Sequence, residues 1–326
     1  MEKDIKGLYF GVLDYGFISL VDVMGGDKEI EDAARVSYGS TIRKTSQTNG
    51  LIRYLRRMRH TSPFEMCELK FHACAPLFVI NQWFRHRTAS TNSYSGRFSL
   101  MPMMFYTPSA EQFKKQSKSN KQGRDETIEE SKYKAAVEGW NNGRKETQKL
   151  YEELVGSDLA RELARIDLPL STYSQFYWKI DLHNLFHFLG LRLEEHAQWE
   201  IREYAKIMAA MVKIVAPLSF QAWLDYEFYG AKFSIMEIDV IRRFISRTYY
   251  NDNPERLISV NDSVSIKELN DSYELSDREI NELFSKLEPK DISNFELDLS
   301  LAKTAEFFAK KLATAVPKID ANFKIE

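Results

Sequence analysis

The chain has 326 residues, of which 44% are hydrophobic and 13% aromatic, so it can bury a large core. Its formal net charge of −2 excludes the generally basic surface of a nucleic-acid-binding protein, and no apolar stretch is long enough to span a bilayer. The N-terminal residues lack the apolar core of a signal peptide, and the two cysteines, Cys67 and Cys74, lack metal-ligand spacing. These features predict a cytoplasmic protein with reduced thiols and with neither a nucleic-acid nor a membrane partner.

The first third of the chain predicts a mixture of strands and helices. Aromatic and β-branched residues with glycines between residues 8 and 23 predict one or two strands. Apolar residues three or four apart predict helices over 29–38 and 51–60, separated by a polar loop. Residues 68–79 then read as a strand, and residues 80–86 as a short helix.

Further along the chain helices predominate. Residues 109–130 are polar, basic and without periodicity, which predicts a flexible loop, and a helical pattern follows over 127–154. A helix over 158–166 must end before Pro169, and the aromatic-rich residues 171–180 read as a strand. Apolar stripes predict a helical pair over 181–193 and 196–215, the second ending at Pro217.

The most informative segment runs from Arg85 to Arg97, where three arginines and a histidine lie among short polar side chains. An apolar segment precedes it, and no Asp or Glu occurs between Ala73 and Ala110. Buried or half-buried arginines need anionic partners, and serine and asparagine side chains suit phosphate oxygens. The segment therefore predicts a site for a small ligand that carries phosphate.

The order Arg-His-Arg-x-x-Ser-x-Asn-x-x-Ser-x-Arg in this segment resembles the signature of the flavin-dependent thymidylate synthases at every fixed position. Two further segments are similar to that family: His60 to Glu65, and the region that runs from Leu191 to Glu200. The resemblance covers roughly residues 8 to 232. It implies a catalytic domain over 1–232 with an α+β fold, a mixed sheet flanked by helices.

The resemblance also implies an activity. The chain would be a methyltransferase that converts deoxyuridine monophosphate (dUMP) to thymidylate. FAD would be the cofactor, NADPH the reductant and 5,10-methylenetetrahydrofolate the carbon donor, with tetrahydrofolate released. It further implies a homotetramer whose active sites are shared between subunits.

Arginine suits the nucleotide part of such a site, because its planar fork of donors binds phosphate oxygens and stabilises charge on a pyrimidine edge. The family's pattern places Arg192 as the residue that supports pyrimidine ionisation. The resemblance implies that Ser95 binds substrate, and a nucleophilic role is not favoured because no general base is predicted within its reach. The residues expected to bind dUMP are Gln82, Arg85, Ser93, Ser95, Gly96, Arg97, Arg165 and Arg192.

No Gly-x-Gly-x-x-Gly motif is present, so the flavin is not expected in a Rossmann-type site. The resemblance implies another set of flavin-binding residues: His60, Ser62, Glu65, Arg85, His86, Arg87, Thr88, Asp181, His183, His187 and His196. The chain departs from the family's common pattern at Met66, Asp181, His183 and His187. We expect these departures to tune flavin affinity and to preserve activity.

Two other interpretations stay open at this point. His183, His187 and His196, with Glu194 and Glu195 nearby, form a candidate zinc or iron site, although the spacing lacks the metalloprotease pattern and we expect no metal. Alternatively, the arginines between residues 53 and 59 and those of the 85–97 segment could form a nucleic-acid-binding surface with Tyr94 or Phe98 as stacking rings.

Residues 233–326 form a C-terminal extension that has no counterpart in the resemblance. The order Ser276-Asp277-Arg278-Glu279 before an apolar run is a helix-capping pattern, and residues 300–313 read as an amphipathic helix. The extension is therefore predicted to be mainly helical, and its role is left open.

Overall fold

A computed structural model describes residues 5–36, 48–118, 122–246, 259–260, 286 and 295–317. The chain divides into two compact units, one of residues 1–223 with 295–326 and one of residues 224–294. The last third of the extension thus belongs to the same compact unit as the N-terminal two thirds of the chain. The larger unit carries every candidate site residue.

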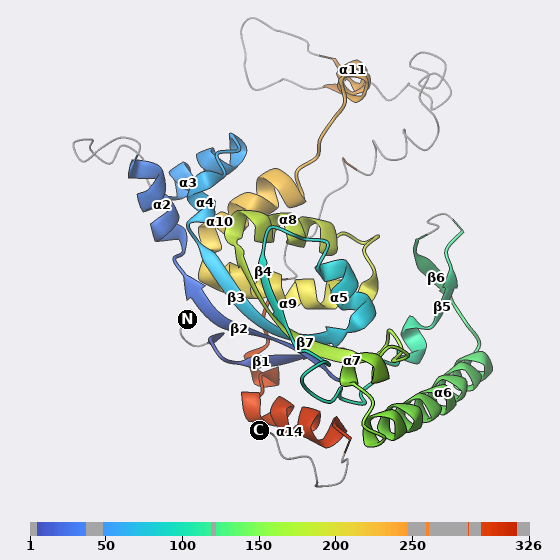
Figure 1. The fold of residues 1–326 in the computed structure, drawn as a ribbon. Helices are drawn as coiled ribbons and strands as arrows, with labels where there is room; N and C mark the ends of the chain where they lie inside the picture. Colours follow the sequence, from blue (N-terminus) through green and yellow to red (C-terminus); the bar gives the residue numbers. More distant parts are fainter. Residues whose placement is uncertain are drawn as a thin grey trace, which may run out of the picture. The chain divides into compact units, whose positions relative to one another are not determined.

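The larger unit is built on one antiparallel sheet of five strands, ordered β1-β2-β3-β7-β4 (Figure 1). The strands are β1 (Tyr9–Val12), β2 (Gly16–Met24), β3 (Glu68–Pro76), β7 (Tyr173–Asp181) and β4 (Ser90–Ser93). The strands predicted over 8–23 and 171–180 are confirmed. The strand predicted over 68–79 ends at Pro76, because α5 (Leu77–Trp83) begins there.

Alternation along β3 and β7 directs large apolar side chains to one face of the sheet. Phe71 of β3 stands opposite Trp178 of β7 on this face, and both side chains are fully buried. Trp83 of α5 packs against Trp178 with ring centroids 5.6 Å apart, and against Tyr204 of α9 (Trp199–Val215) at the same distance. Helices α5 and α9 therefore cover this face, together with α8 (Leu182–Arg192).

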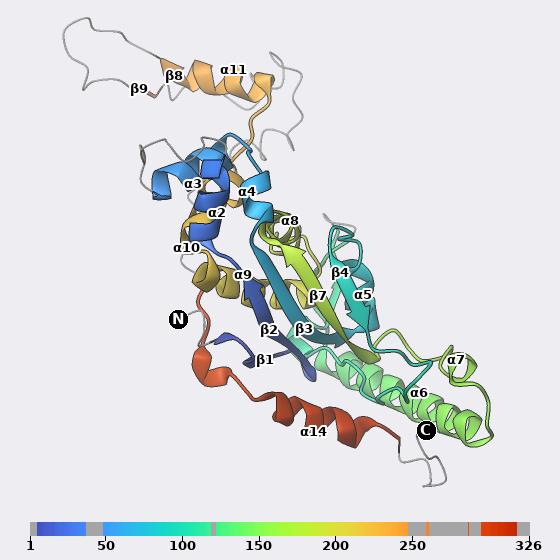
Figure 2. The ribbon, with the colours of Figure 1, turned by 60° about the vertical axis from the view of Figure 1, so that its left-hand side comes forward.

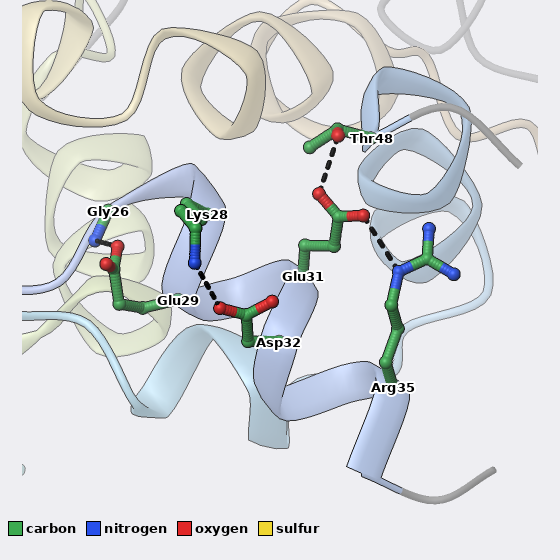
Figure 3. A network of polar contacts seen from close by, with 7 residues as sticks. All are labelled: Gly26, Lys28, Glu29, Glu31, Asp32, Arg35 and Thr48. Carbon is green, nitrogen blue, oxygen red and sulfur yellow. Dashed lines mark hydrogen bonds and ion pairs between the residues drawn. The ribbon is translucent and has the colours of Figure 1, made fainter. Parts of the chain in front are cut away.

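Helices α2 (Asp27–Arg35) and α3 (Thr48–Arg57) lead into the short α4 (Ser62–Glu65). A polar network joins the first two (Figure 3): the buried Glu31 carboxylate accepts from Arg35 Nε at 2.8 Å and from Thr48 Oγ1 at 2.5 Å. Gly26 N–H donates to Glu29 Oε2 at 2.9 Å and satisfies one donor at the start of α2. The network fixes α3 on α2, and α3 in turn places His60 and Ser62.

Asp27 connects this region to α10 (Pro217–Trp223). Its carboxylate accepts from Leu218 N, Ser219 N and Ser219 Oγ at 2.7, 2.9 and 2.6 Å, so it caps the first turn of α10. We expect Asp27→Ala to lower the free energy of unfolding by about 1–2 kcal/mol, because three charge-assisted hydrogen bonds are lost. Urea denaturation measures this. Asp32→Ala, which removes only an exposed pair with Lys28, should change it by less than about 0.5 kcal/mol, and equal effects would contradict the capping role.

The segment 109–130, predicted to be a flexible loop, has regular structure where it is described, and that prediction is wrong. It contains a 3-10 turn η2 (Ala110–Gln112) and a hairpin of β5 (Lys114–Gln116) with β6 (Arg124–Thr127). The hairpin is polar on both faces and so carries no apolar period. Arg124 Nη2 donates to the buried Glu200 carboxylate of α9 at 3.0 Å and holds the hairpin on the unit. Helix α6 (Glu130–Gly156) confirms the helix predicted over 127–154, and α7 (Arg161–Ala164) is shorter than predicted.

Residues 295–317, which we call the C-terminal strap, begin beside α9 and α10, where Glu296 pairs with Lys213 and Phe295 packs on Phe220, and continue to the Tyr9 and Phe17 side of the sheet. The strap contains a 3-10 turn η4 (Leu299–Leu301) and α14 (Ala305–Ala315), so the helix predicted over 300–313 is present. Its backbone pairs with β1, where Lys303 and Tyr9 exchange hydrogen bonds of 2.7 and 3.0 Å. Figure 2 shows α14 running beside β1, away from α9.

The smaller unit contains a π-helical turn η3 (Leu224–Phe228), α11 (Ile235–Phe244), and β8 (Ile245–Ser246) paired with β9 (Ser259–Val260). Ser234 and Glu237 cap α11 reciprocally, and Lys286 pairs with Glu237 at 2.5 Å, which lowers the pKa of that carboxyl group. The capping pattern predicted at Ser276 lies outside the described residues. Among the helices that the structure describes, none is both long and apolar enough for a membrane span.

Candidate active site

The 85–97 segment lies along one edge of the sheet. It leaves α5 after Trp83, passes through β4, and ends in a turn over 94–99 where Phe98 N and Ser99 N both donate to Ser95 O. β4 pairs only with β7 among the described strands, with Ser90 opposite Lys179 and Ser93 opposite Phe176. Its two ends are therefore about 10 Å apart. Ser90 pairs near the end of β7 that leads into α8, and Ser93 pairs with Phe176 nearer the start of β7. Figures 1 and 2 show α8 at one end of β7 and α7 near the other.

At the α8 end, four predicted site residues meet. Arg192, in the last turn of α8, donates from Nε to His86 Nε2 at 3.1 Å and from Nη2 to the Gln82 carbonyl at 3.3 Å. The ring of His187 lies 6.0 Å from that of His86, and Phe188 packs edge-on to His86 at 4.8 Å. The structure thus brings Gln82, His86, His187 and Arg192 together from segments about a hundred residues apart.

His86 is neutral in this arrangement. Burial, the neighbouring Arg192 guanidinium and His187 lower the pKa of His86 to about 4. Because Nε2 accepts from a guanidinium, the ring proton is on Nδ1. A neutral acceptor orients the Arg192 fork and leaves its positive charge uncompensated, and burial also lowers the pKa of Arg192.

This assignment predicts a pH dependence. An unfolded histidine has a pKa of about 6.5. Below that pH the histidine of the unfolded chain is protonated, whereas His86 of the folded protein stays neutral until the pH approaches 4. Above pH 6.5, His86 makes the free energy of unfolding neither rise nor fall with pH. As the pH falls from 6.5 toward 4, this histidine lowers the free energy of unfolding. His86→Gln, which cannot titrate, should show a smaller loss of unfolding free energy over this window. Identical pH profiles for His86→Gln and the unmodified protein would contradict the assignment.

At the α7 end, the turn over 94–99 contacts the loop that follows α7. A Cβ placed on the buried Gly96 would come within 2.7 Å of Met101 Sδ and 2.9 Å of Arg165 Cδ, so glycine is what allows Arg165 to approach the turn. Arg97 Nε pairs with Glu162 Oε2 at 2.9 Å, and Arg97 N donates to Ser95 Oγ at 3.3 Å. Ser95, Gly96, Arg97 and Arg165 therefore form a second cluster, separate from the one around Arg192.

Most of these cations have no carboxylate partner. Within the described part of the chain, Arg85, Arg87, Arg165 and Arg192 form no ion pair, in contrast to Arg97 with Glu162. Arg85 and Arg87 are exposed, and Arg165 and Arg192 are half-buried. Four uncompensated guanidinium groups at one sheet edge favour a ligand with several negative charges. Ser93 lies between the two clusters on β4 with its side chain exposed.

The remaining predicted flavin residues are spread over three places. His60 and Ser62 line a hollow of about 650 Å³ between α2, α3 and α4, whose walls include Tyr54 and Met66, and His60 stacks on Tyr54 at 5.9 Å. Glu65 ends α4 with an exposed side chain, and Thr88 is exposed ahead of β4. His196 lines a different hollow, also of about 650 Å³, beside the β5–β6 hairpin and pairs with Glu194 at 3.3 Å.

Asp181 and His183 begin α8. Both carboxylate oxygens of Asp181 accept from Asn184, at 2.9 Å from its backbone N and 2.7 Å from Nδ2, so this side chain caps the helix. His183 Nδ1 is buried without a hydrogen-bond partner. A buried ring nitrogen without a partner is costly, and it is the kind of group that a bound cofactor satisfies.

The metal interpretation finds no support. Among the described residues, no three His, Cys, Asp or Glu side chains gather closely enough to hold a metal ion. His183 and His187 lie on α8, whereas His196 lies beyond the end of that helix and contacts Glu194. Cys67 and Cys74 are buried thiols, and burial raises the pKa of Cys74, so a nucleophilic role for Cys74 is disfavoured.

Two residues near the site were not predicted. Gln198 accepts a short hydrogen bond from the Gln82 side chain, and Glu162 pairs with Arg97. Gln198 lies within the His196 to Glu200 segment, so its position in the family resemblance was a usable signal. Glu162 precedes Arg165 by three residues on one helical turn, a spacing that places both side chains on the same face.

The chain is similar to known proteins over most of its length. The family model described as thymidylate synthase complementing protein matches residues 19–218. The flavin-dependent thymidylate synthase of Wolbachia pipientis wMel is 49% identical over 234 residues, which cover 72% of this chain and 82% of that protein. The enzyme of the same name from Thermus thermophilus is 47% identical over 239 residues, covering 73% and 87%.

Among solved structures, the UMP/dUMP methylase PolB of Streptomyces cacaoi, bound with 5-Br UMP, is similar with a TM-score of 0.60 and 32% identity. The match covers 66% of this chain and 96% of that one. The expected α+β fold and methyltransferase class are thereby confirmed, and the nucleic-acid and metal alternatives are not supported. The chain belongs to the flavin-dependent thymidylate synthase family.

Proposed function

We propose that this protein converts dUMP to thymidylate with 5,10-methylenetetrahydrofolate as carbon donor and NADPH as reductant, and that it releases tetrahydrofolate. The folate's methylene carbon bonds to C5 of the uracil ring, the C5 proton goes to solvent, and two electrons reduce the methylene to methyl. FAD, when bound and reduced by NADPH, supplies those electrons as a hydride. The relatives' names and the 5-Br UMP and 5-Br dUMP complexes of the Streptomyces cacaoi enzyme support this choice.

The observation that carries the proposal is the state of Arg192. It is a half-buried cation whose described contacts are a neutral imidazole and a carbonyl oxygen, and its charge is not compensated by the protein. A guanidinium held in this way stabilises negative charge on the pyrimidine when C5 becomes nucleophilic. We assign this role to Arg192, with His86 and Gln82 as the groups that orient it.

The phosphate of dUMP needs the other predicted residues. Ser95, Gly96, Arg97 and Arg165 form the cluster at the α7 end of β4, whereas Gln82, Arg85 and Arg192 are at the α8 end. We infer that one nucleotide is held by the α8-end cluster of one subunit and the α7-end cluster of another, in a homotetramer. The exposed outer edge of β4, with unpaired backbone groups among the described strands, supports such a shared site.

The residues present fit a flavin dinucleotide. Exposed Arg85 and Arg87 offer charge for its pyrophosphate, Thr88 offers a hydroxyl group, and the buried Nδ1 of His183 lacks a partner. The hollow at His60 and Ser62 has aromatic and apolar walls suited to a flat ring. We propose that Glu65, His86, His187 and His196 complete this surface, and that Asp181 contributes by fixing the start of α8. NADPH and the folate would use the same flavin surface in turn.

The proposal also places the protein in the cytoplasm, where its two buried thiols would stay reduced. The deciding assay is tritium release from 5-tritiated dUMP by the full chain with FAD and methylenetetrahydrofolate, with and without NADPH. We expect release that depends on NADPH and an equal amount of tetrahydrofolate. Yellow, flavin-loaded protein that binds dUMP and releases no tritium would refute the reaction. Dihydrofolate as the folate product would refute the assigned source of the hydride.

A further inference from the structure

The C-terminal strap, residues 295–317, ends beside the segment that backs the predicted phosphate-binding turn. Its last helical residue, Ala315, accepts a hydrogen bond of 2.7 Å from Met103 N. We propose that the strap is a positioning element for the 94–99 turn, so that dUMP affinity depends on its docking. This inference rests on the proposed function for the identity of the ligand.

The strap is attached to the larger unit along its length. Phe295 packs on Phe220 of α10 with ring centroids 5.6 Å apart, and Lys303 pairs with β1. Phe308, only 4% exposed, packs against Phe17 at 4.9 Å and against Tyr9 at 6.0 Å. These contacts join the strap to the first two strands of the sheet, and α14 then extends to the 100–106 segment.

The segment 100–106 is held by contacts with several elements, among them the bond of 2.6 Å from Arg144 Nη2 of α6 to Tyr106 O and that of 2.9 Å from Tyr106 OH to Glu200 of α9. In place of regular strand pairing it makes one isolated bridge, between Phe105 and Thr172. The two hydrogen bonds of this bridge run from Tyr173 N to Met104 O at 2.9 Å and from Tyr106 N to Ser171 O at 2.8 Å, and Met103 N donates to Ala315 O. Met104 and Tyr106 share one buried cluster with Phe17, Tyr173 and Phe308, and Leu312 and Ala315 of α14 pack on that cluster.

The same segment, residues 100–106, packs directly against the 94–99 turn. Leu100 O accepts from the Tyr94 hydroxyl group, and Met101 Sδ fills the space beside Gly96 that any larger residue would need. Met101 N in turn donates to Tyr151 OH of α6 at 3.0 Å. A path of direct contacts therefore runs from Phe308 and Ala315 through Met103 and Met101 to Gly96 and Arg165. Releasing the strap removes the bond from Met103 N to Ala315 O and the packing of α14 on this segment.

The test uses point variants of the full chain. Phe308→Ala removes the main anchor, Leu312→Ala is a milder variant on the same helix, and Phe308→Leu is the conservative replacement. Phe307→Ala is the matched control, because Phe307 is the neighbouring ring on α14 and is 42% exposed. For each protein we would measure KM for dUMP, kcat at saturating dUMP, FAD affinity, and amide hydrogen exchange of residues 94–106 and 182–192.

We expect Phe308→Ala to raise KM for dUMP roughly 3- to 30-fold, with kcat and FAD affinity unchanged, Leu312→Ala to act in the same direction, and Phe308→Leu to restore most of the loss. Exchange should become faster in 94–106 and stay constant in 182–192. A lower melting temperature with unchanged KM and unchanged exchange in 94–106 would reduce the strap to a purely stabilising element. An equal effect of Phe307→Ala would also overturn the proposal. Should the unmodified protein not bind dUMP, the proposed function fails, and the exchange measurement alone decides whether the strap positions the turn.

Discussion

Replacing Arg192 with alanine is expected to lower kcat for thymidylate formation by about 10²- to 10³-fold. The guanidinium group is the cation at the α8 end that is held by oriented hydrogen bonds, to His86 and to the Gln82 carbonyl. Its removal would leave the charge that develops on the pyrimidine without a stabilising group. Tritium release from 5-tritiated dUMP at saturating substrate measures the effect.

The variant Arg192→Lys separates charge from geometry. Lysine keeps a positive charge but lacks the planar fork, so we expect it to recover only part of the lost rate. Lys206→Ala is the control, because it removes one exposed positive charge from α9 at an ion pair with Glu203. If Arg192→Ala raised KM for dUMP and left kcat intact, Arg192 would be a binding residue and its role in ionisation would be wrong.

The second large effect is expected in the core. Trp83→Ala should lower the free energy of unfolding by about 3–5 kcal/mol, because the side chain is fully buried and no neighbour can fill its volume. Its indole ring contacts Phe176, Trp178, Phe188 and Tyr204, which come from β7, α8 and α9. Guanidinium denaturation of the full chain, followed by circular dichroism, gives the difference.

Trp140→Ala on α6 is the matched control, because that ring is 41% exposed, and we expect a change of less than about 1 kcal/mol. Trp83 is also the last residue of α5, directly before the 85–97 segment. The Trp83→Ala protein should therefore lose FAD affinity under conditions where it is still folded. If Trp83→Ala lowered the free energy of unfolding by less than about 1 kcal/mol, the Trp83 ring would not be the centre of the core.

The order of elements in the larger unit was accessible from the sequence because their patterns are local. The apolar period of residues 199–215 arises from one buried helix face, and the run of aromatic residues over 173–181 arises from a strand with one buried face. The β5–β6 hairpin was missed for a physical reason. Its residues are polar on both faces, and what holds it is the Arg124 to Glu200 contact between positions 76 residues apart.

The candidate site, too, was predictable from the sequence only where its pattern is local. The 85–97 segment was recognisable because binding phosphate demands particular side chains at close spacing. Its division into two clusters was not, because that depends on β4 pairing with β7, more than 80 residues later in the chain. The contact between Arg192 and His86 likewise joins residues 106 positions apart. Roles could be proposed residue by residue from the family resemblance, but the neutral state of His86 required its surroundings.

The pairing of Lys303 with Tyr9 also has a consequence for the order in which the chain folds. These two residues are separated by almost the whole sequence, and they close the β1 edge of the sheet. During synthesis the first strands emerge long before their final neighbour exists, so the ribosome-bound chain presents an open sheet edge and the uncovered Phe17 ring. Contacts of such high sequence separation form late and slow the last step of folding. A chain whose synthesis stops before residue 303 would therefore keep an unpaired sheet edge that can pair with other chains. Such truncated products would be bound by chaperones or degraded by proteases.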